Sequence, residues 1–529
     1  MIIEIVVLVL TAVVVYAIYK HRKNVNEFRR NGLNVLPGVP LLGNTYKSVF
    51  KRRHIFHDFD EVYRAFPDDK YVGYVDGMNG ALFIRDPDII KQITIKDFDH
   101  FVNRGWILND KDNPLLSNSL LFMKDERWHE MRTTLSPAFT GSKMKKMVPF
   151  MITAAGNIVE HLNKQISGDV SEGVHLDDVM RRYTNDVIAS SAFGLEVNSV
   201  ADRDNEFYAT GQRMSNPNIW QKFNFLLVTI FPFLAKKFNL KLCPDEITDF
   251  FRNIVKNTME YRKINNVERP DMIQLLMEAA KGTLASSKEN DESEFDTARE
   301  LNSKTEIPIK KWTADELTAQ AFLFFSAGFE SSASTLTLAV HELAINPDVQ
   351  RKLYEEIQNL GGHKTALSYE MIQTMKYLDM VVNETLRKWA PAIILNRVCT
   401  KPYLLPPARP GAATYRVEKG KMIYCFVSSI HMDEKYYPDP DRFNPDRFSE
   451  DNKRSREPFT FIPFGTGPRN CIGSRFALLE LKVFLYYLIL NFEILKFEET
   501  TDPLRLSASD FNIKAQGGSW VKLRKRVLD

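Results

Sequence analysis

The chain has 529 residues, enough for one large domain or for two or three ordinary ones. Its hydrophobic content of 44% and charged content of 26% are typical of a folded protein, and a net charge of +3 is too small to indicate a nucleic-acid partner. Four cysteines are too few for a disulfide framework, so the composition fits a reducing compartment.

The first 19 residues have the composition of a membrane anchor. Only Glu4 and Thr11 interrupt an apolar run of about 18 residues, which is near the minimum for crossing a bilayer. The basic residues that follow predict, by the positive-inside rule, that the rest of the chain lies in the cytosol: Lys20, Arg22 and Lys23. A cleaved signal peptide is the alternative, but its positive start and its small-residue cleavage site are missing. We therefore expect a single anchor over residues 1–19.

Residues 20–45 are expected to form a basic and proline-rich hinge, and residues 46–529 to form the body of the protein. Two prolines and two glycines in NVLPGVPLLGN favour a stiff connector over a helix. Most of the chain beyond it has helical patterns. A hairpin is predicted from Tyr71 to Phe83, with DGMNG as its turn, and a short helix from Asp125 to Thr134.

Two segments in the middle of the chain have unusual compositions. Residues 223–238 are apolar and aromatic, with an interruption at Pro232, and core packing is favoured over membrane contact for them. Residues 281–304 are polar and charged, which predicts a surface loop, with disorder as an alternative.

A long helix is predicted from Thr313 to Ala344, beginning with a capping box between Thr313 and Glu316. Its middle is apolar on all faces, so it should be buried. That middle nevertheless contains a glycine, an acid and two hydroxyls, which are unfavourable in a buried helix: Gly328, Glu330, Ser331 and Ser332. Close packing and a functional site explain this pattern equally well.

Two segments later in the chain also contain candidate functional residues. The sequence NETLRKWAP places Glu384 and Arg387 three residues apart on a helix, where a surface ion pair is the simplest expectation. In FIPFGTGPRNCIGSRFALLELK, glycines and prolines precede a helical pattern that runs from Ser474 through Leu490. Cys471 therefore lies at or just before a helix start, a position that lowers a thiol pKa and favours a metal-ligating thiolate. A buried structural cysteine is the alternative.

Taken together, these residues resemble the cytochrome P450 superfamily. The pattern F-x-x-G-x-R-x-C-x-G of its haem loop is matched at every fixed position: Phe464, Gly467, Arg469, Cys471 and Gly473. Further motifs match in the same chain order: Trp128 and Arg132 (W-x-x-x-R), AGFES in the long helix, Glu384 and Arg387 (E-x-x-R), and Arg447 in PDRF. The resemblance covers nearly the whole chain.

The resemblance implies a mainly α fold with small β-sheets, in which haem lies between the long central helix and the cysteine-loop helix. Residues 46–529 are then the catalytic domain. The implied cofactor is heme b (iron protoporphyrin IX), with Cys471 as the axial ligand of the iron. Its implied contacts are Trp128, Arg132, Arg469, Phe464 and Gly473, together with Arg397 and Arg104, because arginines suit the anionic propionates.

On the opposite side of the haem, the resemblance implies that Ala327 and Gly328 form a groove for dioxygen, and that Glu330 and Ser331 relay protons. Ser331 stands where the family usually has threonine. Its side chain lacks the β-methyl group, so its rotamer is less fixed and more uncoupled turnover is expected. Glu384, Arg387 and Arg447 are expected to be structural.

The implied activity is that of a monooxygenase that inserts one oxygen atom from O2 into small hydrophobic substrates. No flavin or nicotinamide motif is found, so electrons should come from NADPH through NADPH-cytochrome P450 reductase, with cytochrome b5 as a second candidate partner. A basic docking face or a plain solvated run is expected at Lys143, Lys145 and Lys146. A substrate pocket or core packing is expected at Phe324, Phe325, Phe329, residues 391–395 and Trp106.

The segments FFSAGFESSAS and RWHEMRTTLSPAFTGSKMKKM resemble those of insect microsomal P450s, the group related to vertebrate drug-metabolising enzymes. This predicts an endoplasmic reticulum membrane protein, with its catalytic domain on the cytosolic face, that oxidises xenobiotics such as plant toxins or insecticides. Oxidation of endogenous hormones or fatty acids is the alternative within the enzyme class. A P450-fold peroxide isomerase and a ligand-binding haem protein are the alternatives outside it.

Overall fold

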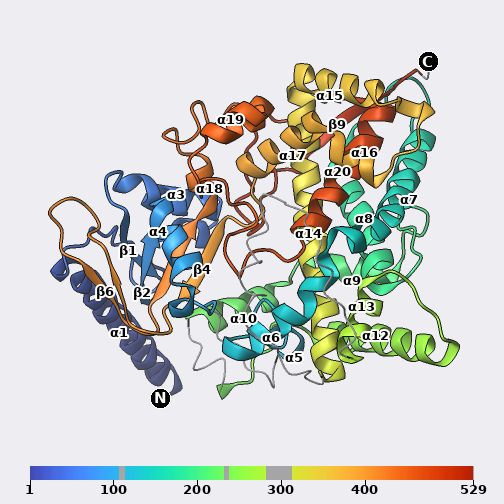
Figure 1. Ribbon diagram of the computed structural model, residues 1–529. Helices are drawn as coiled ribbons and strands as arrows, with labels where there is room; N and C mark the ends of the chain where they lie inside the picture. Colours follow the sequence, from blue (N-terminus) through green and yellow to red (C-terminus); the bar gives the residue numbers. More distant parts are fainter. Residues whose placement is uncertain (106–112, 231–236, 282–311, 528–529) are drawn as a thin grey trace.

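A computed structural model describes residues 1–105, 113–230, 237–281 and 312–527. Most of these residues are helical, and the strands form a four-stranded sheet in the order β1-β2-β7-β4, a three-stranded sheet in the order β3-β9-β8 and a two-stranded sheet β5-β6. Figure 1 shows the largest sheet on the left, beside a larger helical part on the right. The predicted fold class, mainly α with small sheets, is confirmed.

Twelve longer helices are described: α1 (Ile2–Arg30), α3 (Ile55–Ala65), α6 (Asp125–Leu135), α7 (Gly141–Gln165), α8 (Leu176–Ile188), α9 (Glu206–Ser215), α10 (Ile219–Ile230), α12 (Asp245–Asn265), α13 (Met272–Lys281), α14 (Ala314–Ile345), α15 (Pro347–Asn359) and α20 (Ser474–Asn491). A thirteenth, α17 (Lys376–Lys388), contains the E-x-x-R motif. Short helices connect these elements: α2 (Tyr46–Val49), α4 (Pro87–Lys91), α5 (Pro114–Ser117), α16 (Tyr369–Thr374), α18 (Val427–His431) and α19 (Glu450–Ser455). The predicted short helix at 125–134 and the helix after Cys471 are confirmed.

The predicted hairpin is confirmed as the antiparallel pair β1 (Tyr71–Asp76) and β2 (Asn79–Ile84). Strand β2 then pairs in parallel with β7 (Met422–Phe426), which pairs antiparallel with β4 (Ile394–Val398). The smaller sheets consist of β3 (Val174–His175), β8 (Phe492–Lys496) and β9 (Trp520–Lys525), and of β5 (Tyr403–Leu405) and β6 (Tyr415–Val417). Through β4, the large sheet carries Arg397 to the edge of the helical part.

Helix α1 runs without a break to Arg30, so residues 20–30 of the predicted hinge are helical. Its last turns pack on the β1–β2 hairpin, where Phe28 is fully buried. A Cβ atom at Gly73 would lie only 2.6 Å from the Phe28 ring, so this approach requires glycine. Among the residues that the structure describes, no helix has both the length and the apolar character needed to cross a bilayer. The domain boundaries at 19 and 45 stay a prediction.

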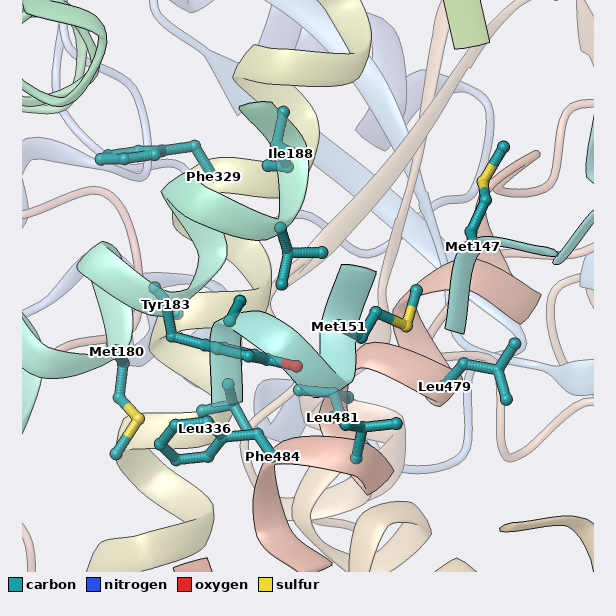
Figure 2. Close-up of a cluster of buried hydrophobic side chains, with 14 of the residues drawn as sticks. Met147, Met151, Met180, Tyr183, Ile188, Phe329, Leu336, Leu479, Leu481 and Phe484 are labelled. Atoms are coloured by element: carbon teal, nitrogen blue, oxygen red, sulfur yellow. The ribbon is translucent and has the colours of Figure 1, made fainter. Parts of the chain in front are cut away.

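The central helix α14 has the predicted capping box. The Thr313 hydroxyl oxygen accepts the backbone N–H of Glu316 at 3.2 Å, and the Glu316 carboxylate accepts the backbone N–H of Thr313 at 2.9 Å. Helices α8, α12 and α20 pack around α14 and bury most of its side chains. Figure 2 shows part of this core, with side chains from α7, α8, α14 and α20.

One packing prediction is wrong. In the segment 223–238, Phe223, Phe225 and Phe238 are exposed instead of buried, so core packing does not explain its apolar composition. Trp220, just before the segment on α10, is exposed as well. Residues 231–236, which complete the predicted apolar segment, lie outside the described residues, as do residues 282–304 of the predicted polar loop.

Candidate active site

The loop before α20 holds Cys471 through its own backbone. The Cys471 N–H donates to the Phe464 carbonyl at 2.8 Å, and the Asn470 N–H donates to the Gly467 carbonyl at 2.9 Å. Gly467 has a φ of +73°, and a Cβ atom there would collide with the Thr94 carbonyl oxygen. Glycine is therefore required for the loop to pack against the π-helical turn η1 (Gln92–Lys96). These contacts fix the direction of the Cys471 side chain.

The protein surroundings of the Cys471 thiol disfavour its charged form. The Cys471 side chain is exposed, yet burial dominates the environment of the sulfur and raises its pKa. The Gly473 backbone N–H, Arg132 and Arg104 oppose this rise. The prediction that the helix start lowers this pKa below its usual value is therefore wrong for the protein groups alone. Such surroundings suit a thiolate that ligates a metal cation, because the cation supplies the missing charge compensation.

Four of the predicted cofactor-binding arginines converge near this loop. Arg132 donates to the Asn470 backbone carbonyl at 3.0 Å and to the Asn470 side-chain oxygen at 2.7 Å. Arg104 donates to the Arg469 carbonyl at 3.1 Å, and Arg397 donates to the Asn396 carbonyl at 2.8 Å. Arg469 and Arg397 are 3% exposed, and Arg132 is 5% exposed.

The charges of these arginines repel one another. Burial lowers the pKa of Arg397 to about 9, with a further contribution from Arg104. Burial and the other three guanidiniums hold the pKa of Arg469 far below its usual value. Within the described part of the chain, no carboxylate forms a salt bridge with Arg104, Arg397 or Arg469, and the Nε atoms of Arg104 and Arg397 are buried without a hydrogen-bond partner. The cluster therefore fits a ligand that carries more than one negative charge, as haem does through its propionates.

Trp128 and Arg469 support each other. The Arg469 guanidinium lies 4.0 Å from the centre of the buried Trp128 ring, which is cation–π geometry. Three of the Arg469 N–H groups donate to the carbonyls of Val102, Leu120 and Met123. Arg469 thus also fixes the segment that precedes α6. Phe464 packs at the edge of the main core, and Gly473 is the N-cap of α20.

The residues of α14 that were predicted to lie on the dioxygen side of the haem point to different faces of the helix. Ala327 is exposed, whereas Ser326 and Gly328 on either side of it are half-buried. The Ser331 hydroxyl donates to the Ala327 carbonyl at 2.6 Å. A Cβ atom at Gly328 would lie 2.8 Å from Ile188 Cδ1, so close packing of α8 against α14 accounts for this glycine. Ala327 and Ser331 are one helical turn apart and share a face.

Glu330 is held in an ion-pair cluster. Arg181 on α8 lies 3.2 Å from both of its oxygens, and Lys514 Nζ lies 2.7 Å from Oε1. These two cations hold the pKa of Glu330 below its usual range despite burial. The sequence did not suggest Arg181 or Lys514, because neither has a recognisable spacing to the central helix.

A second acid near α14 was also missed. Glu480 on α20 is fully buried, and among the described residues its carboxylate oxygens have no partner at hydrogen-bond geometry, although Ser332 is near enough to lower its pKa. A signal was present, since Glu480 is an acid within the apolar run FALLEL.

The E-x-x-R pair is buried rather than a surface pair. Arg387 binds both oxygens of Glu384 at 2.7 and 2.9 Å and donates to the carbonyls of His431 and Pro440. Arg447, in the 3-10 turn η7 (Pro445–Phe448), lies 3.5 Å from Glu384. The expectation of a surface ion pair is wrong for this motif, and the three residues form a compact triad.

Some of the predicted pocket residues are buried in the core, and others are at least partly accessible. Phe325 and Phe329 are buried and stack on each other at 5.4 Å within an aromatic cluster around Phe193 and Phe251, so core packing is the correct alternative for both. Phe324 is half-buried and packs edge-on against Phe139. Ala392 is exposed within residues 391–395, and Trp106 lies outside the described residues.

The basic run on α7 is partly paired with acids. Lys145 pairs with Glu370, and Lys143 lies 3.7 Å from Glu278. These partners favour a solvated charge run over a free docking face at this position.

Comparison with known proteins agrees with this geometry. Residues 34–520 match the family model described as cytochrome P450. The chain is 41% identical to cytochrome P450 9e2 of Blattella germanica over 518 residues, 95% of each chain. It is 39% identical to the probable cytochrome P450 9f2 of Drosophila melanogaster over 514 residues, 95% of this chain and 96% of that one. It is also 37% identical to the probable cytochrome P450 6a13 of the same fly over 474 residues, 88% of each chain.

Proposed function

The chain belongs to the cytochrome P450 family and is a monooxygenase, and on this premise we propose which residues serve its reaction, where it acts and on what. We propose that Cys471 is the thiolate ligand of heme b, and that Arg104, Arg132, Arg397 and Arg469 hold its propionates. The observation that carries this assignment is the convergence of four largely buried arginines on one loop cysteine, with no salt bridge from Arg104, Arg397 or Arg469 to a carboxylate among the described residues.

Bound haem supplies the redox chemistry that activates dioxygen. The chain's own residues position the cofactor and deliver protons. The Phe464 carbonyl accepts the Cys471 backbone N–H and orients this residue, and the Gly473 N–H stabilises the charge on its sulfur. On the other side, the Ser331 hydroxyl is one turn from the exposed Ala327 and can exchange a proton at its Oγ. The Ala327 carbonyl holds that hydroxyl in place, which offsets part of the rotamer freedom of serine relative to threonine.

Glu330 keeps its charge through Arg181 and Lys514, so it takes up a proton only when this cluster opens. We therefore assign Glu330 a role in holding α14, α8 and the segment around residue 514 in register. Proton transfer to Ser331 then depends on groups beyond the predicted Glu330–Ser331 pair.

The proposed electron donor is NADPH-cytochrome P450 reductase, with cytochrome b5 as a second donor. The proposed substrates are small hydrophobic xenobiotics, such as plant toxins or insecticides. This proposal is supported by the two segments that resemble insect microsomal P450s and by the apolar character of α14 around Ala327. Oxidation of hormones or fatty acids remains the alternative to test in the same substrate screen.

The proposed location is the cytosolic face of the endoplasmic reticulum membrane, with residues 1–19 as the anchor. Exposed apolar side chains on α1 and α10 support membrane contact: Leu8, Val14, Val15, Ile219 and Trp220. Deleting residues 1–19 should weaken binding to phospholipid vesicles, and adding Trp220→Ala should weaken it further. Undiminished vesicle binding by the doubly altered protein would contradict this arrangement.

The first experiment compares the wild type with Cys471→Ser, each loaded with haem and reduced under carbon monoxide. A thiolate-ligated complex has a strongly red-shifted Soret band, which should appear in the wild type and be lost in the variant. A band at the position typical of histidine or neutral-thiol ligation in the folded wild type would contradict the ligand assignment. NADPH consumption and product formation with added reductase then separate a monooxygenase from a ligand-binding protein or a peroxide isomerase.

A further inference from the structure

His431 is the last residue of α18, at a junction between three parts of the fold. Helix α18 packs against α3 and α17, and Figure 1 shows it between them. The His431 side chain is fully buried, and its ring packs against the Phe461 ring at a centroid distance of 5.5 Å. Both ring nitrogens have a partner, one in α17 and the other at the start of the loop that carries Cys471. A buried imidazole with two backbone partners holds their segments together.

The two partners determine the protonation state of this ring. The Ile462 backbone N–H lies 3.0 Å from Nε2 and can only donate, so Nε2 must be an acceptor. The Arg387 carbonyl oxygen lies 3.1 Å from Nδ1 and can only accept, so Nδ1 carries the proton. Burial, together with the charges of Arg387 and Arg456, lowers the pKa of His431 to about 3 and keeps the ring neutral. One tautomer of the neutral imidazole therefore satisfies both segments at once.

On one side, the ring is tied to the buried Glu384 triad. The Arg387 carbonyl belongs to the last turn of α17, where carbonyls have no partner within the helix, and His431 supplies the missing donor. The Arg387 guanidinium donates in return to the His431 backbone carbonyl at 2.9 Å, while it binds both oxygens of Glu384. His431 and Arg387 thus bind each other twice, and the triad holds the ring in place.

On the other side, the ring holds the start of the haem loop. Ile462 is 3% exposed, and its N–H donates to His431 Nε2. The Ile462 carbonyl accepts the Gly465 N–H at 3.0 Å, and the Phe464 carbonyl accepts the Cys471 N–H at 2.8 Å. Backbone hydrogen bonds therefore lead from the imidazole, through the turn at Ile462, to Cys471.

We propose that His431 is a positioning residue for the thiolate: its neutral ring holds the start of the haem loop against the Glu384 triad, so that Cys471 stays in place as a ligand. Without an acceptor at Nε2, the buried Ile462 N–H would lose its partner, and the turn before Cys471 would be free to move. A displaced thiolate takes up a proton more easily, because burial already disfavours its charge. This inference rests on the proposed ligation of haem by Cys471.

Two amide substitutions separate the two hydrogen bonds of the ring. In His431→Gln the amide oxygen can replace Nε2 and keep the bond from Ile462, whereas in His431→Asn the amide nitrogen can replace Nδ1 and keep only the bond to Arg387. Reduction of the haem-loaded proteins under carbon monoxide measures the ratio of thiolate-ligated to neutral-thiol complex. This ratio should fall roughly tenfold in His431→Asn, because one buried donor is left unsatisfied, and should stay near the wild-type value in His431→Gln.

The reduction potential of the iron gives a second readout, which a loss of stability alone does not move. It should rise in the folded fraction of His431→Asn, because a weakened thiolate donates less electron density, and should be unchanged in His431→Gln. Urea unfolding of both variants records how much stability each bond contributes. The same ratio and the same potential in the two variants would overturn the proposal and make His431 a purely structural residue.

Hydrogen exchange in the haem-loaded wild type tests the same link if neither variant folds. The amides of Ile462, Gly465 and Cys471 should exchange at similar rates, since they open together when the bond to His431 breaks. Faster exchange at Ile462 than at Cys471 would show that the loop keeps its position without the histidine, and the proposal would be wrong. A wild type without the red-shifted Soret band would instead refute ligation by Cys471, and the exchange rates would still report whether His431 holds the loop.

Discussion

Two clusters of buried arginines differ in their counter-ions. In the Glu384 triad, Arg387 is fully buried, and its guanidinium donates to both carboxylate oxygens of Glu384 and to two backbone carbonyls. Near Cys471, the hydrogen bonds of Arg104, Arg397 and Arg469 within the described residues go to backbone carbonyls. Burial lowers the pKa of all three, and neighbouring guanidiniums lower the pKa of Arg397 and Arg469 further. A buried charge needs compensation. Arg387 has a carboxylate partner within the protein, whereas these three arginines have none among the described residues and therefore fit an anionic ligand.

The difference separates structural from ligand-binding arginines without reference to motifs. Removal of one partner from the Glu384 triad should destabilise the fold. Removal of one arginine from the cluster beside Cys471 should instead destabilise the complex with haem. The two kinds of variant should therefore respond oppositely to haem removal.

The largest effect is expected for Glu384→Gln. Breaking a buried ion pair leaves an uncompensated charge, which costs about 3–5 kcal/mol of unfolding free energy. Urea unfolding followed by circular dichroism should show this loss with and without haem. The control Glu160→Gln removes an exposed pair with Lys164 and should give no measurable change. If the two variants are equally stable, the triad does not support the fold.

A smaller effect of the opposite kind is expected for Arg397→Met. The apoprotein should be no less stable than the wild type, because the substitution removes a repelled buried cation whose pKa is lowered to about 9. Haem affinity should fall by on the order of 2 kcal/mol, because a desolvated charge pair is lost. Transfer of haem to excess apomyoglobin measures the affinity, and thermal unfolding of the apoprotein measures the stability. Loss of apoprotein stability with unchanged haem transfer would place Arg397 in the structural class.

The sequence was sufficient for features that are local or lie within a motif. The capping box at Thr313, the hairpin after Tyr71 and the pairing of Glu384 with Arg387 depend on residues a few positions apart, and all three are confirmed. Position in space was harder to predict. The burial of the Glu384 pair, the core packing of Phe325 and the exposure of Phe223 depend on which distant elements pack together.

The ion-pair partners of Glu330 and the apolar burial of Glu480 could not be predicted from the sequence for the same reason. Lys514 is 184 positions after Glu330, and only the folded chain brings them to 2.7 Å. The pKa of Cys471 was predicted in the wrong direction because a helix start is a local feature, whereas desolvation depends on the whole surrounding fold.

The same argument about charge compensation applies to Glu480, a buried acid with no salt-bridge partner among the described residues. Its folded-state pKa of about 8 lies above the unfolded value of 4.5, so the folded state holds more protons between these values. Stability should therefore fall as the pH rises through this range, and Glu480→Gln should remove the decrease. Between about pH 5 and pH 7 the difference between wild type and variant should change by about 2 kcal/mol, measured by urea unfolding at each pH. Parallel pH profiles would mean that the acid is compensated in the folded protein.

The smallest effect on stability is expected in the cluster where Arg181 and Lys514 both pair with Glu330. Glu330 has a lowered pKa, so its contribution to stability is present above its unfolded pKa and is lost as the pH falls through the folded value. Lys514→Met leaves Arg181 in place and should lower stability at neutral pH by only about 1 kcal/mol, with the difference disappearing in acid. The control Lys496→Met removes a half-exposed pair with Asp502 and should show no such pH dependence. A Lys514→Met loss that persists in acid would show that packing, and not the charge of Glu330, is what Lys514 contributes. A loss confined to the pH range where Glu330 is ionised would place this cluster between the Glu384 triad and the arginine cluster beside Cys471.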